Sequence, residues 1–261
     1  MLSAAARRAL REALGEAYVL EAPEDLLAYS YDASPNHPSR PDAVVLPGST
    51  AEVAAVLRLA VEHGFPIVPR GSGTNLAGGT VPVEGGVVIH FGRMNRLLEI
   101  DTENLTATFQ PGLITQKLHQ EVERLGLFYP PDPSSLKIST LGGNVAECSG
   151  GLRGLKYGVT RDYVLGLEVV LPGGQVLRTG GKCVKDVAGY DLTRLLVGSE
   201  GTLGVVTEIT VKLIPLPEAR RTLLAAYGTL EEAARSVQRI LARRILPAML
   251  EFMDRRTIRC I

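Results

Sequence analysis

The feature that most constrains this chain is a glycine-rich loop at residues 69–79, which reads PRGSGTNLAGG. Glycines at this density let successive backbone N–H groups turn inward and form a concave anion-binding nest. Ser72, Thr74 and Asn75 add short side chains that donate hydrogen bonds. The loop therefore predicts a site for a phosphate or pyrophosphate group, the alternative being a surface loop without a ligand.

Two common phosphate-binding motifs do not fit this loop. A Rossmann loop needs a third glycine three positions after Gly73, where the chain has Leu76. A Walker loop needs Gly-Lys followed by Ser or Thr, and residues 69–79 contain no lysine. Both motifs also lead directly into a helix, whereas residues 80–87 are interrupted by proline and glycine. We therefore interpret the loop as a third kind of pyrophosphate cradle.

The segments around the loop have the periodicities of strands and helices. Residues 43–46 predict a buried strand, residues 51–63 a helix that Thr50 caps and Gly64 ends, and residues 66–69 a second strand. A strand, a helix and a strand this close together predict a right-handed parallel unit. Further strands are expected at 87–90, 97–101, 105–110, 163–171, 175–178 and 203–214, helices at 3–14, 23–29 and 114–125, and a linker at 34–41.

The character of the chain changes after Pro217. Residues 221–227 and 248–252 predict strands, and Thr229 with Glu232 forms a capping box for a helix between them. A strand–helix–strand segment of about forty residues does not cover both faces of its own sheet. We therefore expect the start of a further domain, whose apolar face packs on the rest of the chain or on a second copy.

Composition excludes several classes of function. The chain has 28 basic and 28 acidic residues, so it lacks the basic excess that binding a nucleic-acid backbone requires. The charged N-terminus lacks the apolar run of a signal peptide, and no later stretch approaches a membrane span. Cys148, Cys183 and Cys260 are too widely spaced for a metal or iron–sulfur site. We expect a cytoplasmic protein with reduced thiols, no bound metal and no nucleic-acid partner.

Three further segments follow the first loop along the chain. They read PPDPSS at residues 130–135, TLGGNVAECSGG at 140–151 and GSEGTLGVVT at 198–207. The last two are rich in glycine yet lie beside apolar strands, which is typical of backbone lying against a large flat ligand. In this order the four segments resemble the FAD-binding domain of the vanillyl-alcohol oxidase and p-cresol methylhydroxylase superfamily. Within it, the chain most resembles the glycolate oxidase FAD subunit and D-lactate dehydrogenase family.

The resemblance implies an α+β fold with two subdomains, a small parallel βαβ unit and a larger mixed or antiparallel sheet with flanking helices. N-terminal helices and a linker are expected at residues 1–40, the FAD-binding domain at 41–217, and the incomplete start of a ferredoxin-like cap domain at 218–261. The implied activity is FAD-dependent oxidation of a small 2-hydroxy acid such as glycolate or D-lactate. The implied partners are other subunits of a glycolate oxidase complex, including an iron–sulfur subunit, or a second copy of the chain.

In this family the first glycine loop surrounds the pyrophosphate, and the next two segments run beside the pyrophosphate, ribityl chain and flavin ring. The last segment contacts ribose and adenine. Asp132 has the alternative role of capping a turn between two prolines. The resemblance implies cofactor contacts for Arg70, Gly71, Ser72, Gly73, Thr74, Asn75, Gly79, Pro131, Asp132, Thr140, Gly142, Gly143, Asn144, Ser149, Gly151, Tyr157, Glu200, Gly201, Gly204 and Val205.

Some relatives attach FAD covalently through a histidine in the first loop. The histidines of this chain are His37, His63, His90 and His119, and none lies in residues 69–79. Noncovalent FAD is therefore expected, with structural roles for all four histidines. His63, for example, ends a helix, where the helix dipole favours a histidine.

Oxidation of a hydroxy acid needs a base for the hydroxyl proton and a cation for the carboxylate, while a hydride moves to the flavin. The family places these groups on its cap domain, around a His-Gly-Asp-Gly-Asn segment that this chain lacks. We therefore assign no catalytic residue and expect the chain alone to be inactive. Lys137, Arg153 and Lys156 are basic residues near the flavin segments, but surface positions are expected for them. Two alternatives remain, a non-catalytic FAD-binding module that needs a partner chain and a nucleotide-sugar enoyl reductase that uses NADPH.

Overall fold

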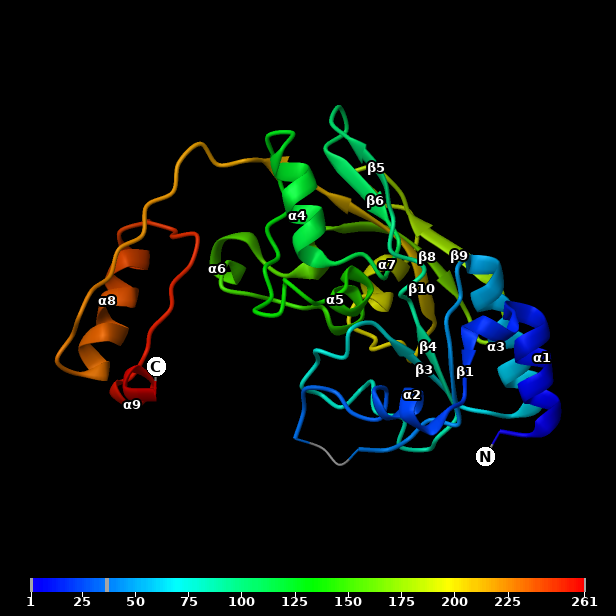
Figure 1. The fold of residues 1–261 in the computed structure, drawn as a ribbon. Helices are drawn as coiled ribbons and strands as arrows, with labels where there is room; N and C mark the ends of the chain where they lie inside the picture. The colour runs from blue at the N-terminus through cyan, green and yellow to red at the C-terminus, as the bar shows by residue number, and fades with distance from the viewer. Residues whose placement is uncertain (1, 36–37, 261) are drawn as a thin grey trace.

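The computed structural model describes residues 2–35 and 38–260. It confirms the predicted α+β fold, because the chain forms a smaller, mainly parallel sheet and a larger antiparallel sheet, each flanked by helices. Figure 1 shows the two sheets side by side, with a C-terminal arm (residues 216–260) that extends away from them.

The smaller sheet has four strands in the order β1-β2-β4-β3. Both β2 (Ala43–Val45) and β3 (Ile67–Arg70) run parallel to β4 (Val87–His90), which lies between them. The predicted parallel unit is present, with α3 (Thr50–His63) as its crossover, although β4 separates its two strands. The short strand β1 (Val19–Leu20) pairs antiparallel with β2 at the sheet edge. The carboxyl ends of β3 and β4 therefore meet at one edge of the sheet.

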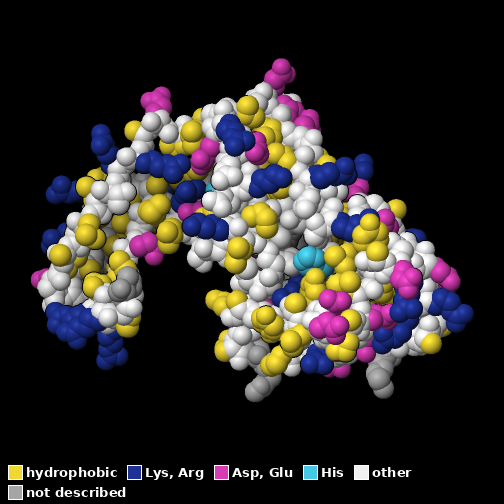
Figure 2. Space-filling model, viewed as in Figure 1, with side chains coloured by type: hydrophobic (Ala, Val, Ile, Leu, Met, Phe, Trp, Pro, Cys, Tyr) yellow, Lys and Arg dark blue, Asp and Glu magenta, His cyan; other side chains and the backbone are white. Residues whose placement is uncertain are grey.

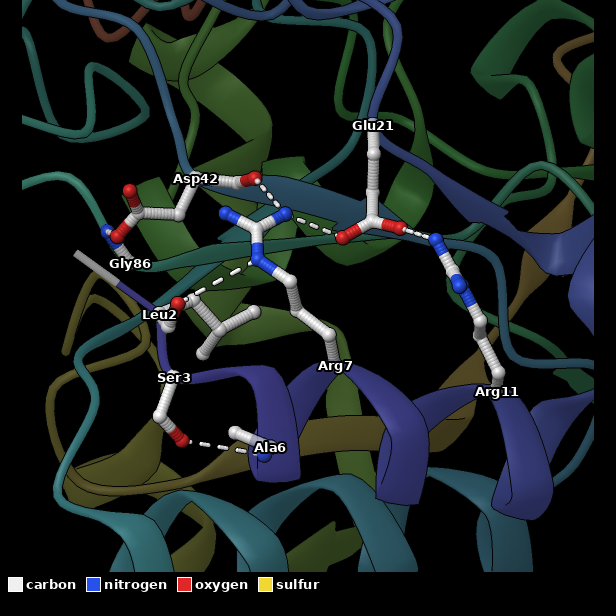
Figure 3. A network of polar contacts seen from close by, with 8 residues as sticks. All are labelled: Leu2, Ser3, Ala6, Arg7, Arg11, Glu21, Asp42 and Gly86. Atoms are coloured by element: carbon white, nitrogen blue, oxygen red, sulfur yellow. Dashed lines mark hydrogen bonds and ion pairs between the residues drawn. The ribbon is translucent and has the colours of Figure 1, made fainter.

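The N-terminal segment packs onto this smaller sheet. The helix α1 (Ala4–Leu14) contacts α3, and the short helix α2 (Pro23–Leu27) follows β1. Glu21 forms ion pairs with Arg7 and Arg11 of α1, as Figure 3 shows. The chain that leaves β1 is therefore tied back to the first helix.

The helix α3 begins one residue earlier than the sequence predicts. Ser49, rather than Thr50, is its N-cap, because Ser49 Oγ accepts a hydrogen bond from the N–H of Glu52 at 3.2 Å. Thr50 instead donates its hydroxyl to Glu168 Oε1 in the larger sheet, at 2.7 Å. Gly64 ends the helix in the left-handed conformation, with a φ of 68°, as predicted.

The larger sheet has the strand order β5-β6-β10-β8-β9, and every neighbouring pair is antiparallel. The predicted hairpin at 163–178 is confirmed by the pairing of β8 with β9. Among the described residues, no helix is both long and apolar enough to cross a membrane. The elements of this half of the chain are β5 (Leu97–Asp101), β6 (Thr106–Phe109), α4 (Thr115–Glu123), β7 (Leu127–Phe128), α5 (Leu141–Glu147), α6 (Gly154–Tyr157), β8 (Val164–Val170), β9 (Val176–Gly180), α7 (Leu192–Leu196), β10 (Val205–Lys212) and β11 (Ile214–Pro215).

Buried side chains join the two sheets into one body. Val170 and Val205 of the larger sheet belong to the same apolar cluster as Val45, Val87 and Ile89 of the smaller sheet. A second cluster fills the space between the larger sheet and the helices α4 and α5. Because side chains of both sheets pack together, the edge between them is held in a fixed geometry.

The C-terminal arm differs from the sequence prediction. The helix α8 (Leu230–Ala242) forms with the predicted capping box between Thr229 and Glu232. The predicted strands at 221–227 and 248–252 are absent, and both segments have irregular backbone. A strand needs a neighbour to satisfy its N–H and C=O groups, and no described strand pairs with either segment.

The expected packing on the rest of the chain is absent for most of the described residues of the arm. Neither α8 nor α9 (Arg255–Cys260) buries a residue, and Leu223 and Leu224 are 93% and 95% exposed. Figure 2 shows hydrophobic and basic side chains exposed along the arm. Its first residues do contact the body, where the Arg220 guanidinium lies 5.4 Å from the centre of the Phe128 ring.

Candidate cofactor site

A cleft of about 320 Å³ opens between the carboxyl end of β3, the helix α5 and the start of β10. Its position agrees with the tendency of α/β proteins to bind ligands beyond the carboxyl ends of parallel strands. Most of the residues that the sequence marks as cofactor contacts come together in its wall. These are Arg70, Gly71, Ser72, Gly73, Thr74, Asn75, Gly79, Thr140, Gly142, Gly143, Asn144, Ser149, Glu200, Gly201, Gly204 and Val205.

The remaining predicted contacts, Pro131, Asp132, Gly151 and Tyr157, do not line this cleft. Asp132 is buried and forms an ion pair with Arg153, with 3.1 Å between Oδ2 and Nε. Burial raises the pKa of Asp132, and the charge of Arg153 opposes that rise. The structure thus pairs the buried Asp132 with Arg153, whose side chain is 16% exposed.

The neighbours of Asp132 form a packed layer beside the cleft. The carbonyl oxygen of Pro131 lies 2.9 Å from Nε2 of the buried His119. A Cβ atom on Gly151 would lie 2.2 Å from the carbonyl oxygen of Asp132, so only glycine fits there. The Tyr157 ring meets the Phe128 ring edge to face at 5.7 Å.

Several residues that sequence reasoning missed also line the cleft. Ser134 and Ser135 lie in the segment 130–135, and Glu147 lies in the segment 140–151, so each belongs to a segment that the sequence already marks. Phe91 and Pro111 have no local signal, because pairing of distant strands brings them to the cleft. The full set of additional residues is Pro69, Leu76, Thr80, Phe91, Pro111, Pro133, Ser134, Ser135, Ala146, Glu147, Gly150 and Val206.

Arg70 places a buried positive charge in the cleft wall. It is 6% exposed, and among the described residues it donates to the carbonyl oxygen and Oγ1 of Thr80, at 3.4 and 3.3 Å. Among the described residues, no carboxylate forms an ion pair with it. Burial lowers the pKa of Arg70, and the charge of Asp32 opposes that effect. A buried cation without an ion-pair partner is costly, so this end of the cleft favours an anionic ligand.

The first glycine loop adds backbone donors beside this charge. No other described residue accepts a hydrogen bond from the N–H groups of residues 72–75. A Cβ atom on Gly71 would lie 2.0 Å from Thr140 Oγ1, and one on Gly73 would lie 2.2 Å from an Arg70 guanidinium nitrogen. Gly73 also has a φ of 68°, which favours glycine. The loop therefore has backbone donors without a partner in the described residues, and Gly71 and Gly73 leave no room for a side chain.

The start of the helix α5 also lines the cleft, and its first N–H groups are paired within the chain, since Leu141 and Gly142 donate to the carbonyl oxygens of Leu113 and Pro111. Its N-cap is Thr140, whose Oγ1 accepts from the N–H of Gly143 at 3.4 Å. A Cβ atom on Gly142 would lie 2.5 Å from Pro111 Cβ, so glycine lets the helix approach this proline closely. The buried Asn144 donates to Thr115 Oγ1 at 2.7 Å, which fixes α5 against α4.

The cleft also has an acidic side, formed by Glu147 and Glu200. Burial raises the pKa of Glu147, and the charges of Glu200 and Asp32 add to the rise. Both carboxylates lie near Gly79, where a Cβ atom would be 3.1 Å from Glu200 Oε2 and 3.9 Å from Glu147 Oε1. Carboxylates accept hydrogen bonds, so this side suits the hydroxyl groups of a sugar. The cleft as a whole suits a nucleoside diphosphate group.

A second pocket of about 290 Å³ adjoins the cleft and shares Gly71, Ser72 and Thr140 with it. His90 and Lys117 line this pocket. Burial lowers the pKa of His90, and the charge of Arg70 lowers it further. As for the other histidines, His63 ends α3, His119 is buried and His37 lies outside the described residues.

Comparison with known protein families agrees with this geometry. Residues 41–180 match the family model described as FAD binding domain, and residues 216–261 match the model described as FAD linked oxidases, C-terminal domain. The chain belongs to the FAD-binding domain family. FAD is therefore its cofactor, and the cleft fits that molecule, with Arg70 and the glycine loop at one side and hydroxyl acceptors at the other.

Curated relatives are similar over most of this chain. The glycolate oxidase subunit GlcD of Bacillus subtilis is 64% identical over 232 residues, which are 89% of this chain and 49% of that protein. The D-lactate dehydrogenase of Anaerostipes hadrus is 43% identical over 220 residues, which are 84% of this chain and 46% of that protein. The chain thus spans about half the length of these relatives.

Solved structures share the fold. An alkyldihydroxyacetonephosphate synthase matches with a TM-score of 0.81 and 28% identity, over 95% of this chain and 47% of that one. A p-cresol methylhydroxylase with substrate bound matches with a TM-score of 0.74 and 25% identity, over 82% of this chain and 44% of that one. The predicted resemblance to the vanillyl-alcohol oxidase and p-cresol methylhydroxylase type is confirmed.

Proposed function

We propose that this chain is the FAD-binding part of an oxidoreductase that oxidises a small 2-hydroxy acid such as glycolate or D-lactate. The observation that carries the proposal is the 64% identity to a glycolate oxidase subunit over 89% of the chain. The D-lactate dehydrogenase similarity points to the same class of substrate. FAD, when bound, supplies the two-electron redox chemistry that converts a 2-hydroxy acid to a 2-oxo acid.

We assign the parts of the cleft to the parts of the cofactor by their chemistry. Arg70 and the N–H groups of residues 72–75 hold the pyrophosphate, because they are the cation and free donors of the cleft. Glu147 and Glu200 accept hydrogen bonds from ribose hydroxyls. FAD is bound noncovalently, since no described histidine lines the main cleft. Acid precipitation should therefore release all yellow colour into the supernatant, and colour in the pellet would contradict this assignment.

The chain alone does not hold the substrate. Arg70 is the one basic residue among those that line the main cleft, and the proposal commits it to the pyrophosphate. Arg153 is already paired with the buried Asp132. A clamp for the substrate carboxylate and a base for its hydroxyl proton therefore come from outside this chain. We propose that a cap domain like the C-terminal half of the relatives supplies both groups. Partner subunits, including an iron–sulfur subunit, join the enzyme in the cytoplasm, where the free thiols of Cys148, Cys183 and Cys260 remain reduced.

The test is flavin bleaching without oxygen. FAD-loaded chain is mixed with millimolar glycolate or D-lactate, and the visible spectrum is followed with and without a full-length relative's C-terminal half. We expect no bleaching by the chain alone, and bleaching by the 2-hydroxy acid after complementation. Dithionite should bleach both samples, which controls for intact flavin. Bleaching of the chain alone within seconds would show a complete active site, and failure of both acids in the complemented sample would exclude the substrate class.

A further inference from the structure

The segment from Tyr29 to Ala33 crosses the outer side of the first glycine loop. It precedes residue 41, where the match to the FAD-binding family begins. Asp32 is 8% exposed, and its Oδ2 accepts a hydrogen bond from Asn75 Nδ2 at 2.7 Å. Its Oδ1 accepts from the N–H of Ser34 at 2.8 Å and from the Ser34 hydroxyl. A buried carboxylate outside the matched residues thus binds directly to the loop that faces the cofactor.

The contact with Asp32 fixes the direction of a hydrogen-bond chain that ends at Arg70. A carboxylate only accepts, so Asn75 must turn its amide nitrogen to Asp32 and its Oδ1 to the other side. That Oδ1 accepts from the Thr80 hydroxyl at 2.9 Å. Thr80 Oγ1 in turn accepts from Arg70 at 3.3 Å. Asp32, at the acidic end of this series of hydrogen bonds, therefore orients Arg70, the cation in the wall of the cleft.

The same segment also orients the backbone of the loop. The N–H of Ala33 donates to the carbonyl oxygen of Gly73 at 3.1 Å. In a trans peptide the carbonyl group and the following N–H point in opposite directions. With the Gly73 oxygen held on the outer side, the N–H of Thr74 is turned away from Ala33, and Thr74 lines the cleft.

We propose that residues 29–33 form a strap that holds the first glycine loop in its phosphate-binding shape, with Asp32 as a positioning residue for the FAD pyrophosphate. Asp32 acts through Asn75 and Thr80 and does not touch the cofactor. The inference rests on the proposed FAD site and adds a segment that lies before the FAD-binding match. Its experiment separates failure of the strap from failure of the FAD site.

The negative charge of Asp32 is compatible with a nearby pyrophosphate because both carboxylate oxygens are occupied by donors. Burial raises the pKa of Asp32, but the hydrogen bonds from Ser34 and Asn75 and the charge of Arg70 outweigh that effect and lower it. Asp32 is therefore ionised at neutral pH. Orientation of the loop by Asp32 raises FAD affinity, whereas repulsion between the Asp32 carboxylate and the pyrophosphate lowers it. Removal of the carboxylate shows which of the two effects dominates.

The experiment is a titration of the FAD-free full chain with FAD, followed by quenching of flavin fluorescence. Asp32→Ala should weaken binding about tenfold, which corresponds to about 1.4 kcal/mol. Asp32→Asn keeps an acceptor for Asn75 and should recover most of the affinity. Asn75→Ala should resemble Asp32→Ala, and the double variant should be no weaker than either single one, because both act through one chain of contacts.

The matched control is Glu21→Gln. Glu21 lies in the same N-terminal segment and forms ion pairs with Arg7 and Arg11, on the side of α1 (Figure 3). This variant should lower the unfolding temperature and leave the FAD dissociation constant within twofold of wild type. If destabilising the N-terminal segment were enough to weaken FAD binding, Glu21→Gln would bind FAD more weakly as well. That result would overturn the proposal.

The remaining outcomes are also decisive. Unchanged or tighter FAD binding by Asp32→Ala would overturn the strap while the FAD site stands, because wild type provides the reference. If Asp32→Ala does not fold, Asn75→Ala decides, and wild-type affinity in that variant overturns the proposal. A wild-type chain that binds no FAD would instead show that the proposed function itself is wrong.

Discussion

The position of Gly73 sets two requirements, a positive φ and no Cβ atom, that only glycine meets. Its φ of 68° disfavours a β-branched residue, and a Cβ atom there would lie 2.2 Å from an Arg70 guanidinium nitrogen. We predict that Gly73→Val folds but binds no FAD, because the valine displaces Arg70. The matched control is Gly64→Val, which has the same φ with no atom within 4 Å of the added Cβ. Spectra of the purified variants should show colour only in the control, and stoichiometric FAD in Gly73→Val would contradict the loop assignment.

Arg70 is expected to stabilise the complex with FAD and not to stabilise the FAD-free chain. Hydrogen bonds to charged groups contribute about 1.5–3 kcal/mol, which corresponds to roughly a 10- to 100-fold loss of FAD affinity in Arg70→Met. The free chain should keep or gain stability, because a buried cation without an ion-pair partner is removed. Thermal unfolding of the FAD-free variant and a FAD titration measure both effects. Lower stability together with unchanged affinity would show that Arg70 is structural.

At the scale of single residues, the sequence predicts the glycines of the cleft well because their spacing is local. Gly71 and Gly73 lie within one loop, and their density alone indicates a nest. Asp32 carries no such signal, since only the folded chain brings it to the loop. Asp132 was predicted at the cofactor or as a turn cap, and the structure pairs it with Arg153.

At the scale of elements, Glu168 connects the larger sheet to α3, the crossover helix of the smaller sheet. It lies on β8 and accepts from Thr50 at the start of α3 at 2.7 Å, from Thr207 at 3.0 Å and from Arg178 at 2.8 Å. Loss of a buried acceptor's partners costs about 1–3 kcal/mol. We predict that Glu168→Gln lowers the free energy of unfolding by that amount at pH 7, as measured by urea unfolding.

The pH dependence of this effect has a defined sign. Burial raises the pKa of Glu168, but the hydrogen bonds from Thr50, Arg178 and Thr207 outweigh it and lower the pKa. The stabilisation is therefore present above the unfolded-state pKa of about 4.3 and is lost as the pH falls through the lower folded-state pKa. The difference between wild type and Glu168→Gln should shrink below about pH 4. A difference that grows in acid would contradict this role.

The helix α8 should be the least protected helix of its length in the chain. It has 13 residues and buries none of them, whereas α3 has 14 residues and buries five, including Val53 and Val56. An isolated helix shorter than about 12–15 residues is marginal in water. Hydrogen–deuterium exchange should therefore be much faster in peptides of α8 than in those of α3. Equal protection would indicate that the arm packs on the body or on a second copy.

Two elements show where sequence signals are insufficient. The helix α5 contains Gly142 and Gly143, which argue against a helix, and close approach to Pro111 explains the glycine at 142. The capping residue Thr140 was the available local signal. The predicted strand at 221–227 fails for the opposite reason, because its local pattern is suitable but no neighbouring strand is present.

At the scale of the whole molecule, the order of the main elements is predictable because helix periodicity, the hairpin turn and the glycine segments are local. The fold class follows from the resemblance of the four segments to a known family. The arrangement of strands is less predictable. Insertion of β4 between β2 and β3, and addition of β1 at the edge, depend on pairing between distant residues. That pairing creates the edge at which β3, α5 and β10 enclose the cleft.

The central claim is that this cleft holds one FAD, and titration of the FAD-free chain tests it most directly. Flavin fluorescence is followed as FAD is added to a known concentration of protein, with riboflavin, which lacks the pyrophosphate, as the comparison ligand. We predict saturation at one FAD per chain and much weaker binding of riboflavin, because Arg70 and the glycine loop act on the pyrophosphate. No saturable binding of FAD, or equal affinity for riboflavin, would contradict the account.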